Sequence, residues 1–260
     1  MLRSIVQWFR KAFCRIERPD SAIKGQKLDY STYAARMREG RSQEEAMQLA
    51  IGGSFELIGP LERELLKIFG LQTDHYLIDV GCGSGRLARP LMEYLSEQGR
   101  YLGIDVVNDL LDHARKIVDR PNWRFELADG FCISEDDNQA DMICFFSLVT
   151  HLLHEQSYLY LQDAKRVLKP GGKIVFSFIE FEMPGHWLIF ESNIADVYTN
   201  HHPLNQFISR NAIHVWADHL GLTVDRIVDS NEALVKLPTK PDGPVSPRAL
   251  GQSICVLSKL

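Results

Sequence analysis

Three glycines at alternate positions, Gly81, Gly83 and Gly85, are the most informative residues of this sequence. They follow residues 77–80, which are typical of a buried strand, and they precede a segment that is typical of a helix. A strand, a glycine turn and a helix start together form a pocket lined by backbone N–H groups. Glycine is needed there because the turn uses unusual backbone angles and a ligand must approach the main chain closely. The pattern therefore predicts a ligand site at this turn.

Three aspartates lie close to this turn or at the ends of the strands expected after it. Asp79 stands two residues before the first glycine, Asp105 ends the second expected strand, and Asp129 ends the third. In a doubly wound sheet the ligand lies beyond the carboxyl ends of the strands. Asp105 suits the two hydroxyls of an adenosine ribose, and Asp129 suits the adenine amino group. The alternative interpretations are a helix cap for Asp105 and a turn residue for Asp129.

The elements that must position these residues alternate between strand and helix. This alternation predicts an α/β fold, with a doubly wound, mostly parallel sheet and helices on both faces. A helix over 59–70 is expected to lead into the first strand. Strands are expected near 76–80, 101–105, 123–127, 141–146, 173–179, 222–228 and 252–257, and helices near 85–98, 108–118, 155–168 and 208–220. The stretch 168–172 is expected to end a helix and form a turn.

Five segments resemble the class I S-adenosylmethionine-dependent methyltransferases, in register over residues 77–180. They are LIDVGCGSGR, YLGIDVV, FELADGF, ADMICFFSLVTHL and AKRVLKPGGKIVFSF. The resemblance implies a Rossmann-like, seven-stranded sheet with a reversed final hairpin, and S-adenosyl-L-methionine as methyl donor without a metal. A nicotinamide site is disfavoured, because a dinucleotide fingerprint has a glycine where Arg86 stands.

The resemblance also implies which residues hold the cofactor. The glycines would approach its methionine part, Asp79 would hold its amino group directly or through water, Asp105 its ribose and Asp129 its adenine. The full predicted set is Asp79, Gly81, Cys82, Gly83, Gly85, Asp105, Val106, Ala128, Asp129, Gly130 and Ser147.

Candidates for the chemistry of transfer follow the fourth expected strand. Methyl transfer from a sulfonium is an in-line displacement, and a general base is needed only for a protonated acceptor of high pKa. His151 and His154 are the catalytic candidates, since a histidine accepts a proton near neutral pH; the alternative is a packing or capping role. Candidates for the acceptor pocket come from the N-terminal region and from the insertion 181–204: Tyr30, Tyr33, His186, Tyr198 and His201.

The chain is expected to comprise a basic amphipathic helix (1–19), a helical N-terminal cap (20–75) and the S-adenosylmethionine-binding domain (76–260, with the insertion 181–204). Residues 1–27 carry a net charge of +5 and the remaining residues −10. Apolar residues recur at helical spacing over 2–16, among basic residues. Such a helix suits peripheral contact with an anionic membrane through residues 2–18, and its alternative role is packing on its own domain or on a second subunit.

The composition of the chain limits the classes of methyl acceptor. The net charge of −5 argues against general nucleic-acid binding, and the (D/N)PPY tetrapeptide of amino-methylating nucleic-acid enzymes is absent. The five cysteines are scattered without metal-binding spacing, which favours a cytoplasmic protein, with membrane-peripheral attachment as the variant. We therefore expect a methyltransferase for a small-molecule, lipid-linked or glycan-linked acceptor; the alternative is a non-catalytic S-adenosylmethionine-binding or scaffold protein. The pattern leaves open the methylated atom and the oligomeric state.

Overall fold

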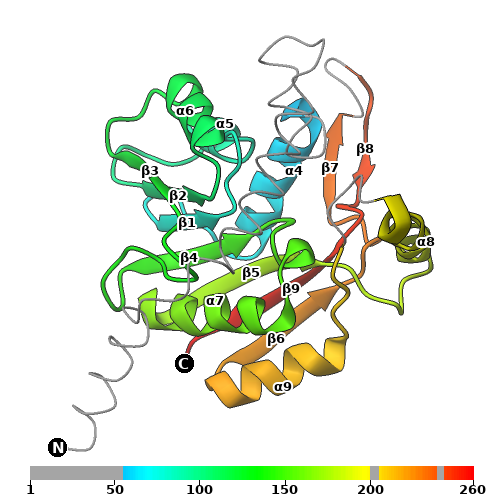
Figure 1. Ribbon diagram of the computed structural model, residues 1–260. Coiled ribbons are helices and arrows are strands. Elements are labelled where there is room, and N and C mark those ends of the chain that lie inside the picture. Colours follow the sequence, from blue (N-terminus) through cyan, green and yellow to red (C-terminus); the bar gives the residue numbers. More distant parts are fainter. Residues whose placement is uncertain (1–54, 200–204, 239–242) are drawn as a thin grey trace, which may run out of the picture.

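A seven-stranded sheet with helices on both faces forms the centre of the computed structural model, which describes residues 55–199, 205–238 and 243–260 (Figure 1). The strand order is β3-β2-β1-β4-β5-β9-β6. The strands of this sheet are β1 (Tyr76–Val80), β2 (Arg100–Asp105), β3 (Trp123–Leu127), β4 (Ala140–Phe145), β5 (Leu168–Phe178), β6 (Thr223–Val228) and β9 (Ser253–Ser258). The predicted fold class, the class I methyltransferase fold, is confirmed.

The five strands β3, β2, β1, β4 and β5 pair in parallel in that order, and β9 is the single reversed strand of this sheet. β9 pairs antiparallel with both β5 and β6, as the expected reversed hairpin requires. In register, Val80 of β1 lies opposite Ile104 of β2, and Asp79 lies opposite Cys144 of β4. The carboxyl ends of β1, β2 and β4 therefore meet at one edge of the sheet, where the candidate residues were expected.

Two layers of helices cover the sheet, each over its own apolar core. On one face α4 (Phe55–Ile68), α5 (Ala88–Leu91) and α6 (Asn108–Ile117) pack through residues such as Leu65, Leu91 and Leu111. On the other face α7 (His154–Val167) and α9 (Arg210–Leu220) pack through residues such as Leu161 and Ile213 (Figure 1). A short 3-10 turn, Val149–His151, links β4 to α7.

Two elements differ from their predicted lengths. The helix after the glycine loop was expected over 85–98 but is only α5, because Pro90 lacks an N–H and the chain continues in tight turns such as Met92 N–H to Arg89 O at 3.3 Å. The turn expected at 168–172 lies inside β5, whose register shifts there. Gly171, with φ of 78°, donates its N–H to Lys259 O at 2.7 Å and so keeps this irregular stretch paired.

Two further elements were not predicted. The insertion contains a helix, α8 (Pro184–Thr199), and the proline-rich stretch after β6 forms a hairpin of β7 (Val235–Pro238) and β8 (Val245–Arg248). The basic helix of 1–19 and the candidates Tyr30, Tyr33 and His201 lie outside the described residues, so the three-part division of the chain stays an expectation. In the parts of the chain that are described, no helix has the length and apolar character needed to cross a bilayer.

Candidate active site

The glycine loop between β1 and α5 adopts backbone angles that favour glycine. The φ angles of Gly81, Gly83 and Gly85 are 83°, 56° and 93°. The amides of Gly81 and Cys82 donate to Ile104 O at 2.7 and 3.1 Å, which ties the loop to β2. These two amides are therefore engaged within the protein, and a ligand at this loop would meet the main chain without their N–H groups.

Neighbouring elements pack closely against the loop on two sides. A Cβ placed on Gly81 would lie 3.2 Å from the side chain of Leu148, in the segment after β4. A Cβ on Gly85 would lie 3.2 Å from the methyl of Ala114 on α6. Both glycines thus serve close approach as well as unusual backbone angles, and the loop has a fixed place between α6 and the end of β4.

Asp79 lies at the end of β1 with a buried side chain. Its Oδ2 accepts a hydrogen bond from the hydroxyl of Tyr101 at 2.7 Å, and its Oδ1 accepts one from the thiol of Cys144 at 3.5 Å. Burial raises the pKa of Asp79 to about 7, against the opposing effect of the Tyr101 hydroxyl. Both of these donors are neutral, so the ionised carboxylate would be stabilised further by a ligand ammonium group.

Asp105 links the end of β2 to the glycine loop. Its Oδ2 accepts the N–H of Gly83 and its Oδ1 accepts the N–H of Val107, both at 2.9 Å. Burial raises the pKa of Asp105, and these backbone hydrogen bonds act in the opposite direction. The side chain is half-buried, as is neighbouring Val106, so each oxygen keeps capacity to accept a further hydrogen bond.

The segment after β3 is joined to the same edge. Ala128 donates its N–H to the main-chain oxygen of Asp105 at 2.9 Å. Gly130 has φ of 68°, and its carbonyl accepts the hydroxyl of Tyr160 at 3.2 Å. The side chain of Asp129 is exposed, so it is free to meet a ligand at this rim.

Ser147, directly after β4, has a left-handed backbone with φ of 56°, which is unusual for a residue with a side chain. Its N–H donates to Ser177 Oγ on β5 at 2.7 Å, and Ser177 Oγ donates to Gln252 Oε1 at 2.6 Å. The conformation is therefore held by β5 and by the start of β9. Sequence reasoning found Ser147 from its place at a strand end but had no signal for Ser177 or Gln252.

His151 lies in the short turn after β4. Burial lowers its pKa to about 4, so its imidazole is neutral at physiological pH. A neutral imidazole has the form of a base, but a conjugate acid of such low pKa makes proton transfer from an acceptor of high pKa unfavourable.

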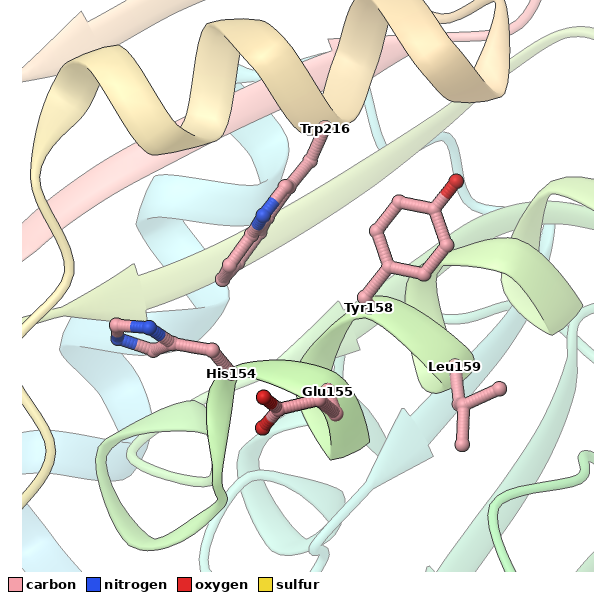
Figure 2. A pocket seen from close by; sticks show the side chains of 5 residues that line it. All are labelled: His154, Glu155, Tyr158, Leu159 and Trp216. Carbon is pink, nitrogen blue, oxygen red and sulfur yellow. The ribbon is translucent and has the colours of Figure 1, made fainter.

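His154, at the start of α7, is engaged with the segment before α9. Its Nε2 lies 2.9 Å from Phe207 O and 3.3 Å from Gln206 Nε2. Its ring also meets Trp216 edge-on at 5.6 Å. Figure 2 shows both residues, with Tyr158, at a surface hollow of about 360 Å³ between α7 and α9. In this geometry His154 links two elements, and its role in proton transfer stays a prediction.

His186 is buried and joins three segments at the ends of β5 and β9. Its Nε2 lies 3.2 Å from Gly251 O, and its Nδ1 accepts the N–H of Glu180 at 3.0 Å. Both ring nitrogens are thus engaged within the protein, which favours a positioning role over direct contact with an acceptor. Tyr198 lies in α8 at a position whose side chain is not described.

Sequence reasoning missed an ion pair at the carboxyl end of β5. Glu180 is fully buried, and Arg210 at the start of α9 donates to its two oxygens at 2.7 and 2.8 Å. Arg210 also donates to Asp229, after β6, at 2.6 Å, and Ser253 donates to Glu180. A signal was present, because Glu180 follows an apolar strand in the same way as the aspartates that were found.

The arrangement fits an adenosine linked to an amino acid. A loop with positive φ approaches without side chains, a carboxyl at the end of β2 faces it through Gly83, and the buried Asp79 is suited to a cationic partner. Within the described ranges, no group of three or more histidine, cysteine or acidic side chains is placed to hold a metal ion.

Comparison with known proteins supports this interpretation. A family model described as a methyltransferase domain matches residues 77–172. A ubiquinone biosynthesis O-methyltransferase of Coxiella burnetii is 26% identical over 176 residues, which cover 64% of this chain and 71% of that protein. A demethylmenaquinone methyltransferase of Shouchella clausii is 31% identical over 117 residues, 44% of this chain and 48% of that protein.

Solved structures share the fold. Magnesium protoporphyrin IX methyltransferase from Synechocystis PCC 6803, with bound SAH, superposes with a TM-score of 0.59 at 13% identity, covering 93% of this chain and 100% of that one. A putative methyltransferase from Haloferax volcanii, in complex with the activator Trm112, has a TM-score of 0.60 at 18% identity, covering 89% and 96%. The matched domain and the curated relatives show that this chain is an S-adenosylmethionine-dependent methyltransferase, and its sheet has the class I methyltransferase fold.

Proposed function

We propose that this methyltransferase acts on an apolar small molecule or a lipid-linked acceptor that carries the methylated group on a planar ring. The observation that carries the proposal is an aromatic cluster beside the end of β5, made of Phe181, Trp187, Phe190 and Phe207. Phe181 stacks on Phe207 with ring centroids 4.5 Å apart, and Phe190 meets Trp187 at 5.1 Å and Phe207 at 5.6 Å.

The cluster is partly open to solvent. Phe181 is 55% exposed and Trp187 is 49% exposed, and Leu188 beside them is 71% exposed. An exposed group of large apolar side chains is unusual on a water-soluble surface and is typical of a binding region. It lies where α8 follows β5, close in sequence to the His186 and Glu180 contacts that join this edge of the sheet. A flat apolar ring fits such a surface better than a glycan does.

The curated relatives point the same way, since their names concern ubiquinone biosynthesis and demethylmenaquinone. An acceptor that resides in lipid also agrees with membrane contact through the basic residues 2–18, which we include in the proposal.

The roles proposed for the cofactor site are those that the family resemblance implies, and the geometry of the site supports them. S-adenosyl-L-methionine supplies a methyl group already activated on sulfur. Asp79 would hold the amino group, Asp105 the ribose and Asp129 the adenine, while Ser147 and its hydrogen-bonded partners would form the floor toward the acceptor. Because His151 is a weak base, we expect an acceptor whose proton is easily lost, such as a phenol-type hydroxyl or an acidic carbon.

Transfer of radiolabelled methyl groups from S-adenosylmethionine tests the proposal. The panel would hold polyprenylated phenols, the same phenols without the tail, and hydrophilic glycans. We expect labelling of the phenols, with a lower KM for the tailed compounds, because the cluster adds apolar contact. Replacement Phe181→Ser should raise KM about tenfold, the loss of about 1.4 kcal/mol of apolar contact.

The matched control is Val215→Ser, which removes an exposed apolar side chain from α9, away from the cluster. It should leave KM unchanged. Labelling of glycans in preference to phenols would contradict the proposed acceptor, and equal effects of the two variants would contradict the role of the cluster. Binding of S-adenosylmethionine without labelling of any acceptor would instead favour a non-catalytic protein.

A further inference from the structure

A buried ion pair connects α4 to the residue that directly follows the glycine loop. Arg86 donates through Nη2 to Glu62 Oε1 at 2.5 Å and through Nε to Glu62 Oε2 at 3.2 Å. The side chain of Arg86 is 9% exposed and that of Glu62 is 2% exposed. Removing two charges from water is expensive, and an apolar pair of similar volume is often no less stable. A buried pair of this kind is therefore weak evidence for stabilisation of the fold and favours a functional role.

The backbone of Arg86 is also held by α4. A Cβ on Gly59 would lie only 2.3 Å from Arg86 O, so the helix and the loop approach as closely as glycine allows. Gly59 and Glu62 are three positions apart and share one face of α4. One face of α4 thus contacts the main chain and the side chain of the same residue, which fixes the far end of the glycine loop.

The loop needs such an anchor because its own backbone is permissive. Three of its residues are glycines with positive φ, so the loop has more conformational freedom than an ordinary turn. Its near end is held by β1 and by the hydrogen bonds to Ile104, and Arg86 stands at its far end. The pair also acts on Asp79, since the charge of Glu62 raises and that of Arg86 lowers the pKa of that carboxyl. The pair is therefore within electrostatic range of Asp79, the residue proposed to hold the amino group of the cofactor.

We propose that Glu62 is a positioning residue for S-adenosyl-L-methionine, which acts through Arg86 to hold the glycine loop against the amino-acid end of the cofactor. This inference rests on the cofactor roles proposed above for the loop and Asp79. It concerns a residue on α4, outside the segments that carry the family resemblance.

Two ligands separate a positioning role from a general effect. S-adenosylhomocysteine carries the amino-acid end, and methylthioadenosine has the same adenosine part but lacks that end. Calorimetric titration at about pH 8.5, above the pKa of Asp79, keeps that carboxylate ionised in the wild-type protein. We expect Glu62→Gln to weaken S-adenosylhomocysteine about tenfold and methylthioadenosine by less than about twofold.

A matched control also begins on α4. Glu56 of α4 pairs with Arg89 of α5 at 2.9 Å, and both side chains are more than half exposed. Glu56→Gln breaks a surface link between α4 and α5, where such a pair contributes little. It should leave the affinities for both ligands unchanged.

A second variant guards against loss of folding. Glu62→Leu combined with Arg86→Met replaces the charges by apolar side chains, which often preserves stability. We expect it to melt near the wild-type temperature and still to bind S-adenosylhomocysteine about tenfold more weakly relative to methylthioadenosine.

The inference is overturned if either Glu62 variant keeps the wild-type ratio of the two affinities, because the pair then serves stability alone. It is also overturned if the wild-type protein does not prefer S-adenosylhomocysteine to methylthioadenosine. That second result, unlike the first, would also remove the proposed placement of the amino-acid end at the loop.

Discussion

A single buried carboxyl shows how stability and function oppose each other at the scale of one residue. Asp79 is neutral in the folded protein below its pKa of about 7, whereas its reference pKa in an unfolded chain is 3.8. Between these values the folded state holds more protons, so the contribution of Asp79 to stability falls as the pH rises. At pH 8 the free protein carries a buried charge, which we expect the cofactor ammonium to compensate.

The replacement Asp79→Asn tests this conflict. Asparagine keeps an acceptor for the Tyr101 hydroxyl but carries no charge, so it should stabilise the free protein by about 2–4 kcal/mol at pH 8 and by less at pH 5. The same change should weaken S-adenosylhomocysteine. Thermal melts at the two pH values and calorimetric titration measure both effects. Asp119→Asn, at an exposed position, is the control; a variant that is less stable at pH 8 would contradict the argument.

At the scale of the element, the carboxyl end of β5 is joined to α9 by a fully buried acid. Arg210→Met would leave Glu180 buried without its bidentate partner. We expect a loss of about 2–3 kcal/mol in the free energy of unfolding, below the range for a wholly buried pair because Arg210 is partly exposed. Urea denaturation measures it. Arg226→Met, which breaks the exposed pair with Glu232, should cost less than about 1 kcal/mol, and equal losses would refute the distinction.

Elements with a strong local signal were predictable from the sequence, and the others depended on contacts distant in the chain. β1 matches its predicted bounds because the mostly apolar residues of the strand and the glycines that end it are neighbours in the sequence. The hairpin β7–β8 was missed because four prolines predict a loop, yet the two that lie in the strands, Pro238 and Pro247, are tolerated in the edge strands of a two-stranded sheet. The bulge in β5 was read as a turn because Pro170 and Gly171 are typical turn residues.

The same division holds for the site. Asp79 and Asp105 were chosen from strand ends and glycine spacing. In the structure Asp105 contacts the glycine loop through Gly83, and Asp79 lies in the strand that leads into the loop. His186 was chosen as an acceptor contact from its place in the insertion, but its ring is engaged by Glu180 and Gly251. The contact with Gly251 joins residues that are far apart in the sequence, and no local pattern reveals it.

At the scale of the whole molecule, charge is divided between a basic start and an acidic remainder, +5 over residues 1–27 and −10 over the rest. An anionic lipid surface attracts the first part and repels the second, so contact should occur through residues 2–18 and depend on salt. We expect sedimentation with phosphatidylglycerol-containing vesicles at low salt, and loss of binding at about 1 M salt, where the screening length falls to about 3 Å. Vesicles of phosphatidylcholine alone should bind weakly.

Matched pairs of charge removals locate the contact. Arg10→Gln with Lys11→Gln should reduce the vesicle-bound fraction severalfold, since each basic residue near an anionic surface contributes about 1 kcal/mol. Lys116→Gln with Lys236→Gln removes the same charge from exposed positions on the acidic part. This pair should leave the vesicle-bound fraction as it is in the wild type. If both pairs reduced binding equally, attraction would follow net charge alone. If full-length protein stayed in the supernatant at low salt, residues 2–18 would have another task, such as packing on this chain or on a second copy.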